Sequence, residues 1–499
     1  MNAARLRALR LTVAALVLAT PLAARAADRP ADAPVPDPLP SYQQCYAQAP
    51  AQVSNVAAAC RGFEKFGQDA SALCRRLLQD DAACVTPFAP PVERREVAAY
   101  QSTWVHRALV LQRALGDDLP FREAQWLGTH NSFNAVPDGP NDPPPGLSQL
   151  DSNQQLSMVD QLDSDMRSLE VDAHWALDPH TGQDEVRLCH AESGGYGCTI
   201  EGTLAQGLAP VADWVQRHPG EVLFLYVDDD LQNHAGHEAA AQVVEHAFGS
   251  LVYRSSDDPS AGDRAGACRP LDLALTRAQV LAAGKRVVVW STCEDGATTS
   301  SWNDLVFNDA GKFEQTTSSY ADFPACDGPQ AQQHYGRTFV RYYEDSTFVS
   351  ALATPDGDHI DAPMAAHMAR CGVNLVGFDQ LLPDDSRLAG SIWSWAQDEP
   401  SAAGACAVAR ASDGRFVAVP CSGRHAVACR SGSGWTVLAP AVAVAAAAGR
   451  CGASAGAFAV PRSGREGALL QAALQRAGAT DAWIAYTDTN GGWAPHDGR

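Results

Sequence analysis

Short apolar runs that end in polar residues recur through the middle of the chain. Trp126-Leu127 leads into Gly128-Thr129-His130-Asn131-Ser132-Phe133, and the runs 168–172, 186–190 and 221–228 also finish in polar side chains. Two histidines, an amide and three carboxylates therefore stand where four apolar runs end. This pattern predicts a parallel barrel whose active site lies at the carboxyl ends of its strands.

Further strand-like runs continue to about residue 382. They lie at 286–290, 338–343 and 373–378, and 305–308 is a weak candidate for the eighth strand. Strands that alternate with helical or loop segments over this length favour an α/β fold, with a TIM-like (β/α)8 barrel over residues 121–385.

The segment before the barrel divides into three parts. Basic residues at the start, an apolar run over 11–22 and Ala24-Arg25-Ala26 are typical of a secretory signal peptide over 1–26. A linker rich in Pro and Ala over 27–40 should be extended and flexible. Residues 41–120 have a helical pattern, and 91–115 predicts one amphipathic helix that leads into the barrel. No later apolar run is long enough to span a bilayer.

Cysteine content and charge narrow the class of protein. The chain has 14 Cys, an even number, and an exported chain of this kind is expected to form disulfides. Four of them (Cys45, Cys60, Cys74 and Cys84) predict a small helical segment tied by two disulfides of undetermined pairing. We therefore expect a secreted or periplasmic protein.

The formal charge is −21, and removal of the signal segment, with its four Arg and no acid, leaves −25. This charge argues against a nucleic-acid partner and against adsorption by bulk charge onto anionic lipid. Transient contact with a membrane surface is still compatible with this net charge.

The polar strand ends resemble those of a known family. Leu127-Gly128-Thr129-His130-Asn131-Ser132, Leu169-Glu170-Val171-Asp172, Leu188-Cys189-His190 and His218-Pro219-Gly220-Glu221, which leads to Asp228, look like the X domain of phosphatidylinositol-specific phospholipase C. The resemblance covers about residues 121–382 and is strongest over the first hundred. It implies a barrel that cleaves a phosphodiester by attack of a neighbouring hydroxyl on phosphorus.

The resemblance also implies roles for the two histidines. His130 would sit against the phosphoryl group as base or transition-state stabiliser, and His190 would be the general acid, although the roles could be reversed. Two imidazoles can transfer protons in both directions near neutral pH. Cys189 and Cys198 could close a short loop that holds His190 in place.

The same motifs suggest a metal. Glu170 and Asp172 are two apart on a strand and point the same way. With Asn131 and Asp228 they could make an all-oxygen site suited to Ca²⁺, or with less support Mg²⁺. In the metal-independent bacterial members an arginine stands about where Asp172 is, so this chain looks like the metal-dependent branch.

Ordinary structural explanations compete with these assignments. A single histidine at a strand end is usually structural, and a Glu-x-Asp pair is usually a solvated strand end. Of the three consecutive aspartates, only Asp228 matches the family position. His174 and Glu192 lie close by in sequence without a motif match, and Arg341 and Lys285 could contact phosphate or be surface charges.

Two other functions remain open. A glycerophosphodiester phosphodiesterase shares the barrel, the paired His and the Glu-x-Asp, but that family opens with His-Arg-Gly and has a Pro-Glu-Asn-Thr segment, both of which are lacking here. The other alternative is a catalytically silent exported binding or adhesion protein. The intact pair of His130 and His190 argues against it.

Residues 390–499 resemble an α+β C-type lectin-like domain whose halves are in swapped order. The second half appears first, around Asp398-Glu399-Pro400 and Val419-Pro420-Cys421, and the first half follows at 458–470 and 483–488. We favour a permuted domain over two partial copies, because one half would leave its apolar face unburied. Its partner would be a protein or, with less support, a sugar, because residues 416–418 offer no side-chain oxygens to a metal.

The lectin-like resemblance also implies two disulfides. Cys406 would pair with Cys421, as beside the family's Val-Pro-Cys. Cys429 would pair with Cys451, which joins the family's last cysteine to the one near its first helix and closes the permuted domain across its new junction. Each bond should stabilise the domain by about 2–4 kcal/mol.

Overall fold

The computed structural model of the chain describes most of the sequence after residue 93. The described residues are 94–135, 152–177, 181–190, 199–257, 268–294, 300–322, 336–345, 360–432, 434–454, 456–489 and 492–496, with 92, 137, 326, 333 and 334. The expected signal peptide, linker and four N-terminal cysteines lie outside them. Among the described helices, none is long and apolar enough to cross a membrane.

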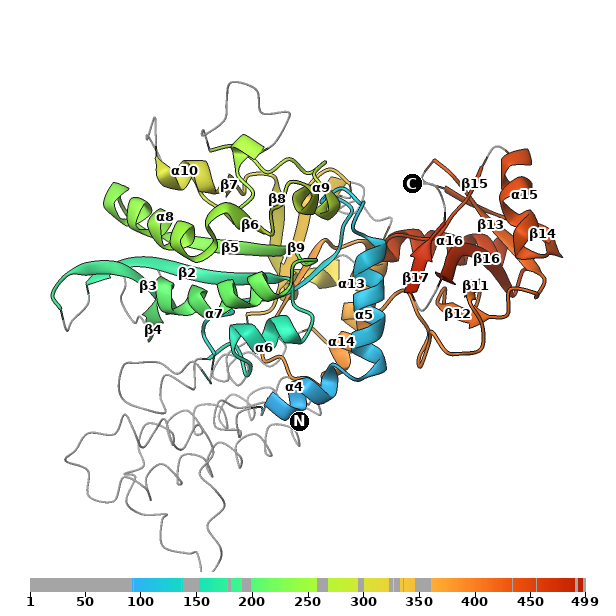
Figure 1. The fold of residues 1–499 in the computed structure, drawn as a ribbon, viewed down its shortest axis with the longest axis horizontal. Coiled ribbons are helices and arrows are strands. Elements are labelled where there is room, and N and C mark those ends of the chain that lie inside the picture. Colours follow the sequence, from blue (N-terminus) through green and yellow to red (C-terminus); the bar gives the residue numbers. More distant parts are fainter. Residues whose placement is uncertain are drawn as a thin grey trace, which may run out of the picture.

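Eight parallel strands form a curled sheet at the centre of the molecule (Figure 1). In spatial order they are β7 (Phe307–Asn308), β6 (Val287–Ser291), β5 (Leu223–Asp230), β2 (Ser168–Leu177), β1 (Trp126–Thr129), β10 (Leu375–Phe378), β9 (Phe339–Tyr343) and β8 (Lys312–Thr316). The inner strands β6 and β10 are buried along their whole length, as expected for a parallel sheet covered on both faces. In the described part of the chain no ladder joins β7 to β8, so the barrel is open there.

Most helices of this region are capped by a side chain at their starts. Thr203 and Gln206 form a capping box at the start of the helix after β4, and Asn233 caps the helix after β5. The α-helices are α4 (Arg94–Tyr100), α5 (Trp104–Leu115), α6 (Met158–Asp163), α7 (Leu204–Arg217), α8 (His234–Phe248), α9 (Arg277–Ala282), α10 (Ser301–Leu305), α13 (Ala362–Cys371) and α14 (Ser386–Gly390).

Three of the predicted elements differ in the structure. The run 186–190 is no barrel strand: β3 (Asp184–His190) lies antiparallel to β2 and pairs with β4 (Thr199–Thr203). The connection between β2 and β3 is too short for the crossover that a parallel strand needs. The parallel strand missing from the prediction is β8. The single helix predicted at 91–115 is two helices, because the Thr103 side chain caps α5.

The C-terminal region forms a second, mixed sheet of seven strands beside the barrel (Figure 1). β16, from the end of the chain, pairs with β11 on one side and β13 on the other, so both halves of the region contribute to one sheet. Its elements are β11 (Cys406–Arg410), β12 (Phe416–Val419), β13 (His425–Ser431), β14 (Gly434–Val442), α15 (Ala447–Ala453), β15 (Ala457–Phe458), α16 (Gly464–Arg476), β16 (Asp481–Thr489) and β17 (Gly492–Pro495).

Four disulfides join two cysteines that both lie in the described residues. Cys406–Cys421 and Cys429–Cys451 confirm both pairs predicted for the C-terminal region. Cys268–Cys293 and Cys326–Cys371 lie in the barrel region. Disulfides in this number indicate a protein that folds in an oxidising, extracytoplasmic compartment.

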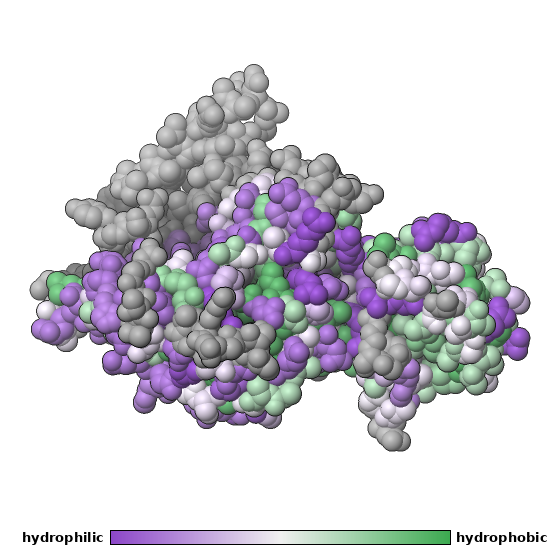
Figure 2. Space-filling model, turned by 90° about the horizontal axis from the view of Figure 1, so that it is seen from above, coloured by the Kyte–Doolittle hydropathy of each residue, from purple (hydrophilic) through white to green (hydrophobic). Residues whose placement is uncertain are grey.

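The C-terminal region packs through α16 against the amino-terminal end of the barrel. The Gly464 N–H donates to Oε1 of Gln125, which directly precedes β1. A β-carbon at Gly464 would lie 2.1 Å from the Ala369 carbonyl oxygen, so this contact requires glycine. Buried residues of both regions form one continuous core. Figure 2 shows that the visible face of the C-terminal region is more apolar than that of the barrel.

Candidate active site

The loop after β1 is fixed to β2 by its own polar residues. The Ser132 N–H donates to the Glu170 carbonyl at 2.9 Å, and the Glu170 N–H donates to Ser132 Oγ at 2.8 Å. Gln161 accepts from the Thr129 hydroxyl and donates to the Ser132 carbonyl. A β-carbon at Gly128 would lie 2.7 Å from Ser168, so glycine allows the two strands to approach. Gly128, Thr129 and Ser132 of the motif therefore hold the two residues between them, at positions 130 and 131.

His130 is buried and paired with a carboxylate. Its Nδ1 lies 3.3 Å from Asp379 Oδ2, and its ring packs at 4.7 Å from that of Tyr343. Burial favours the neutral imidazole, but the charges of Asp379 and Glu170 outweigh it and raise the pKa of His130 to about 9. The ring is therefore an imidazolium at neutral pH.

A second buried pair holds the backbone of Asp379. Glu344 accepts from the Asp379 N–H at 2.5 Å, and Arg387 donates to the Asp379 carbonyl at 2.9 Å. Arg387 also donates to Glu344 at 2.6 Å. Burial raises the pKa of Glu344 to about 7, although Arg387 opposes the shift. This pair fixes the position from which Asp379 reaches His130.

His190 lies between two amides. Its Nδ1 accepts from the Asn134 amide at 3.1 Å, and the Asn134 orientation is set by Asn153 at 2.8 Å. Nδ1 is therefore the acceptor in this contact. The other ring nitrogen, Nε2, lies 3.2 Å from the Asn131 amide. The two predicted catalytic histidines thus face different partners, a carboxylate and amides.

Asn131 connects His190 to Asp172. Its amide lies 3.0 Å from both carboxylate oxygens of Asp172. The orientation that satisfies the hydrogen bonds has nitrogen towards Asp172, so that the amide donates to both oxygens and accepts from His190 Nε2. A cation would instead need the amide oxygen to turn towards Asp172. The φ of Asn131 is +43°, a strained conformation that functional sites often hold. Asn131 and Asp172 therefore have oxygens of the kind that a divalent cation takes, provided that the amide of Asn131 turns.

Glu170 is held by a buried arginine. Arg341 on β9 pairs with Glu170 and with Glu314, and its guanidinium carbon lies 4.7 Å from the ring centre of Tyr343. Lys312 contacts Glu314 at 3.0 Å. The site therefore has two cationic side chains on β8 and β9 that balance its carboxylates, and Glu170 would have to share its carboxylate between Arg341 and any metal.

The remaining candidate residues lie in different surroundings. Asp228 is exposed at the end of β5, in register with Asp172. His174 is buried, and its Nε2 lies 3.4 Å from Asp230. Lys285 precedes β6 and therefore lies at the opposite end of the barrel, where it pairs with Asp257 at 3.0 Å. Cys189 is disulfide-bonded, but Cys198 and Glu192 lie outside the described residues.

Several site residues were missed by sequence reasoning. Asp379 follows the predicted strand 373–378 directly, so the rule that found the other strand ends could have found it. Glu344 follows β9 in the same way. Lys312 and Glu314 had no such signal, because β8 is polar except for Phe313.

Comparisons with known proteins agree with these motifs. Residues 85–385 match the model of the Rv2075c PI-PLC-like domain family. The uncharacterized protein Rv2075c of Mycobacterium tuberculosis strain H37Rv is 42% identical over 456 residues, which cover 87% of this chain and 90% of that protein. Its counterpart MT2135 in strain CDC 1551 matches equally well.

Solved structures are more distant. The phosphatidylinositol-specific phospholipase C of Listeria monocytogenes has 12% identity and a TM-score of 0.40, over 57% of this chain and 98% of that one. The calcium-dependent phosphoinositol-specific phospholipase C of a Pseudomonas species has 14% identity and a TM-score of 0.29, over 55% and 92%.

Proposed function

The chain belongs to the Rv2075c PI-PLC-like family, and from that premise we propose that its barrel is an exported phosphodiesterase of the phospholipase C type. The observation that carries the proposal is that the two imidazoles of the site have opposite hydrogen-bond partners. The Asp379 carboxylate pairs with His130 and raises its pKa, whereas the Asn134 amide donates to Nδ1 of His190. The first arrangement suits an acid and the second a base, and cleavage of a phosphodiester requires both.

The reaction that suits this pair begins with a hydroxyl oxygen of the substrate, which forms a bond to phosphorus. His190 accepts the proton of that hydroxyl. The bond from phosphorus to the leaving oxygen breaks, its electron pair stays on that oxygen, and His130 gives it a proton. This division reverses the one that the family resemblance implies, because the contacts of His130 favour the acid and those of His190 the base.

Negative charge on the phosphoryl oxygens needs a positive partner. Arg341 is 2% exposed and lies against Glu170, so it can supply charge without solvent screening. A Ca²⁺ ion, or with less support Mg²⁺, held by Asn131, Glu170, Asp172 and Asp228, would supply further positive charge to those oxygens.

The substrate class that we propose is a phospholipid or small phosphodiester with a hydroxyl next to the phosphate. Because the mature chain is strongly acidic, contact with a membrane would be transient and local. The C-terminal region, placed at the other end of the barrel, would bind a protein partner rather than substrate.

The decisive experiment is an assay of the purified full chain on a panel of phosphodiesters. Inositol phospholipids, other phospholipids and glycerophosphodiesters would each be tested with and without chelator, with identification of the phosphorus products. A cyclic or monoester product from a substrate with a neighbouring hydroxyl supports the proposal. Turnover only of glycerophosphodiesters would instead assign the chain a glycerophosphodiesterase activity. No turnover of any substrate would overturn the proposal that the barrel is an enzyme.

A further inference from the structure

Three potential metal ligands meet at the rim of the barrel, outside the site already described. His234 and Glu238 are four residues apart on α8 and so share one face of the helix. Glu294 follows β6 and reaches the same place, where its Oε1 lies 2.8 Å from His234 Nδ1. One ligand atom from each side chain lies within 4.8 Å of the other two. The cluster thus joins two separate segments, both at the carboxyl end of the sheet.

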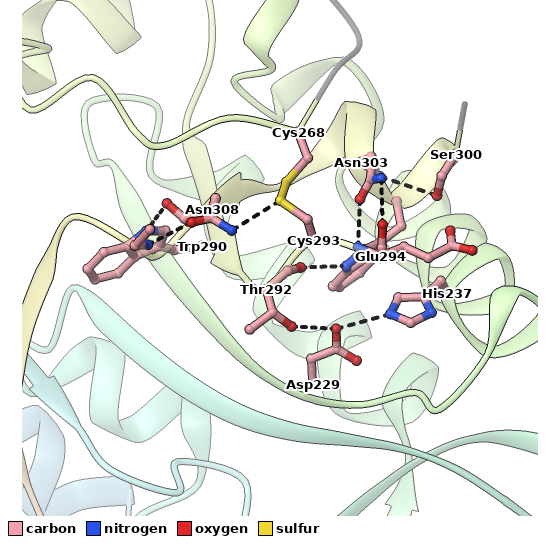
Figure 3. Close-up of a disulfide and its surroundings, with 12 residues drawn as sticks. Asp229, His237, Cys268, Trp290, Thr292, Cys293, Glu294, Ser300, Asn303 and Asn308 are labelled. Carbon is pink, nitrogen blue, oxygen red and sulfur yellow. Dashed lines mark hydrogen bonds and ion pairs between the residues drawn. A yellow bond between two sulfur atoms is a disulfide. The ribbon is translucent and has the colours of Figure 1, made fainter. Parts of the chain in front are cut away.

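Glu294 is held rigidly. The preceding residue forms the Cys268–Cys293 disulfide, and Asn303 bonds the Glu294 backbone on both sides, accepting from its N–H at 2.8 Å and donating to its carbonyl at 3.2 Å. Figure 3 shows Glu294 between this disulfide and Asn303. The backbone from which its carboxylate extends is therefore fixed.

One oxygen of Glu294 has no hydrogen bond of normal geometry. The Glu294 side chain is only 9% exposed, and Oε2 has no such bond. Burial opposes ionisation, but the nearby Ser300 hydroxyl and His234 lower the pKa of this carboxyl. A buried carboxylate oxygen without a donor is costly, and a bound ion is one of the few explanations for it in a native structure. Glu238 is turned into place by Ser301, which donates to it from both its N–H and its hydroxyl, at 2.7 and 2.8 Å.

We propose that His234, Glu238 and Glu294 form a Zn²⁺ site, separate from the proposed Ca²⁺ site. An imidazole and two carboxylates suit Zn²⁺, whereas Ca²⁺ takes oxygen ligands. Ligand atoms around tetrahedral Zn²⁺ lie roughly 3.4 Å apart, so small side-chain movements suffice to close the site. Three protein ligands leave the fourth position to water.

The ion would connect the segment after β5 to the segment after β6. The same two segments already meet at Asp229, which accepts from Thr292 at 2.7 Å and lies 3.0 Å from His237 Nε2 (Figure 3). Asp228 precedes this contact directly. A bound Zn²⁺ therefore stiffens the rim next to the proposed active site without touching the reacting groups.

A second cluster of potential ligands does not compete with this assignment. Cys326, His367 and Cys371 also lie close together, but both sulfurs are used in the Cys326–Cys371 disulfide. Of these two clusters in the described part of the chain, the one at His234 has ligand atoms that are available to a metal.

The test is the titration of ZnCl₂ into the full chain after chelator treatment, followed by calorimetry, elemental analysis and thermal unfolding. The variants are His234→Ala and Glu294→Gln. Two controls are matched to them: His246→Ala removes an exposed imidazole of the same helix, and Asp172→Asn changes the proposed Ca²⁺ site. Because His234 is 65% exposed, its replacement should leave the metal-free fold intact. If Glu294→Gln is destabilised, the Zn²⁺ affinity of His234→Ala alone tests the proposal.

We expect one tightly bound Zn²⁺ and a higher melting temperature with Zn²⁺ in the wild type and both controls. Zn²⁺ affinity should fall at least tenfold in the two test variants, and the rise in melting temperature should disappear. Equal Zn²⁺ affinity in His234→Ala and the wild type, or no Zn²⁺ binding by the wild type, would overturn the proposal. None of these readouts depends on catalytic activity.

Discussion

Nδ1 of His130 lies 3.3 Å from Oδ2 of Asp379, a residue 249 positions later in the chain. The contact exists because β1 and β10 are neighbours in the sheet, so that their carboxyl ends place both residues together. Asn153 and Gln154 also donate to the Asp379 carboxylate, at 3.2 and 3.0 Å. Asp379 is thus fixed by donors at both oxygens and sets the charge of His130.

The first prediction concerns this pair. Asp379→Asn should lower the pKa of His130 from about 9, because burial favours the neutral ring once the opposing charge is removed. If His130 acts as the acid, wild-type kcat/KM falls as pH rises through about 9, and this fall should move to lower pH in the variant. NMR titration of the His130 ring and pH–rate profiles measure the two effects. A ring that titrates at the same pH in both proteins would contradict the assignment.

The catalytic pair gives the second prediction. His130→Ala and His190→Ala should each reduce turnover by about 10²–10⁴-fold, because general acid–base groups typically contribute that much. His246→Ala, an exposed histidine on α8, is the control and should keep full activity. Circular dichroism checks that all three variants fold. Near-wild-type turnover in either test variant would show that its imidazole transfers no proton.

The sequence predicted the candidate site better than the path of the strands. The ends of β1, β2 and β5 could be read because apolar runs stop there and polar residues follow, so His130, Glu170 and Asp172 were found. The direction of β3 could not be read, since pairing depends on the length of the connection rather than on composition. β8 escaped notice because it borders the open side of the barrel and has few apolar side chains.

The metal proposal gives the third prediction. Activity should fall on chelation and return with Ca²⁺, and Asp172→Asn should weaken Ca²⁺ binding or abolish activity. The reason is that Asp172 offers both oxygens beside Asn131. Asp230→Asn removes the same charge from a residue paired with His174 and should leave Ca²⁺ dependence unchanged. Full activity in excess chelator, with no bound metal by elemental analysis, would refute the requirement.

The last prediction concerns stability at the other end of the barrel. Glu221 accepts from Arg113 at 3.0 Å and from Arg167 at 2.8 Å. Burial alone would raise the pKa of Glu221, but the two arginines outweigh it and lower the pKa to about 2. A carboxyl whose pKa is lowered on folding stabilises the fold above its unfolded pKa and loses this contribution as pH falls from about 4.5 towards 2.

Glu221→Gln should therefore reduce the free energy of unfolding by on the order of 3 kcal/mol at pH 7, and by less at pH 3, where the wild type has lost part of the ion pairs. Urea denaturation at the two pH values measures the difference between wild type and variant. Asp213→Asn, on the exposed face of α7, is the control and should change stability little at either pH. A Glu221→Gln effect of equal size at pH 3 and pH 7 would mean that Glu221 stabilises the barrel through packing and neutral hydrogen bonds, and not through its charge.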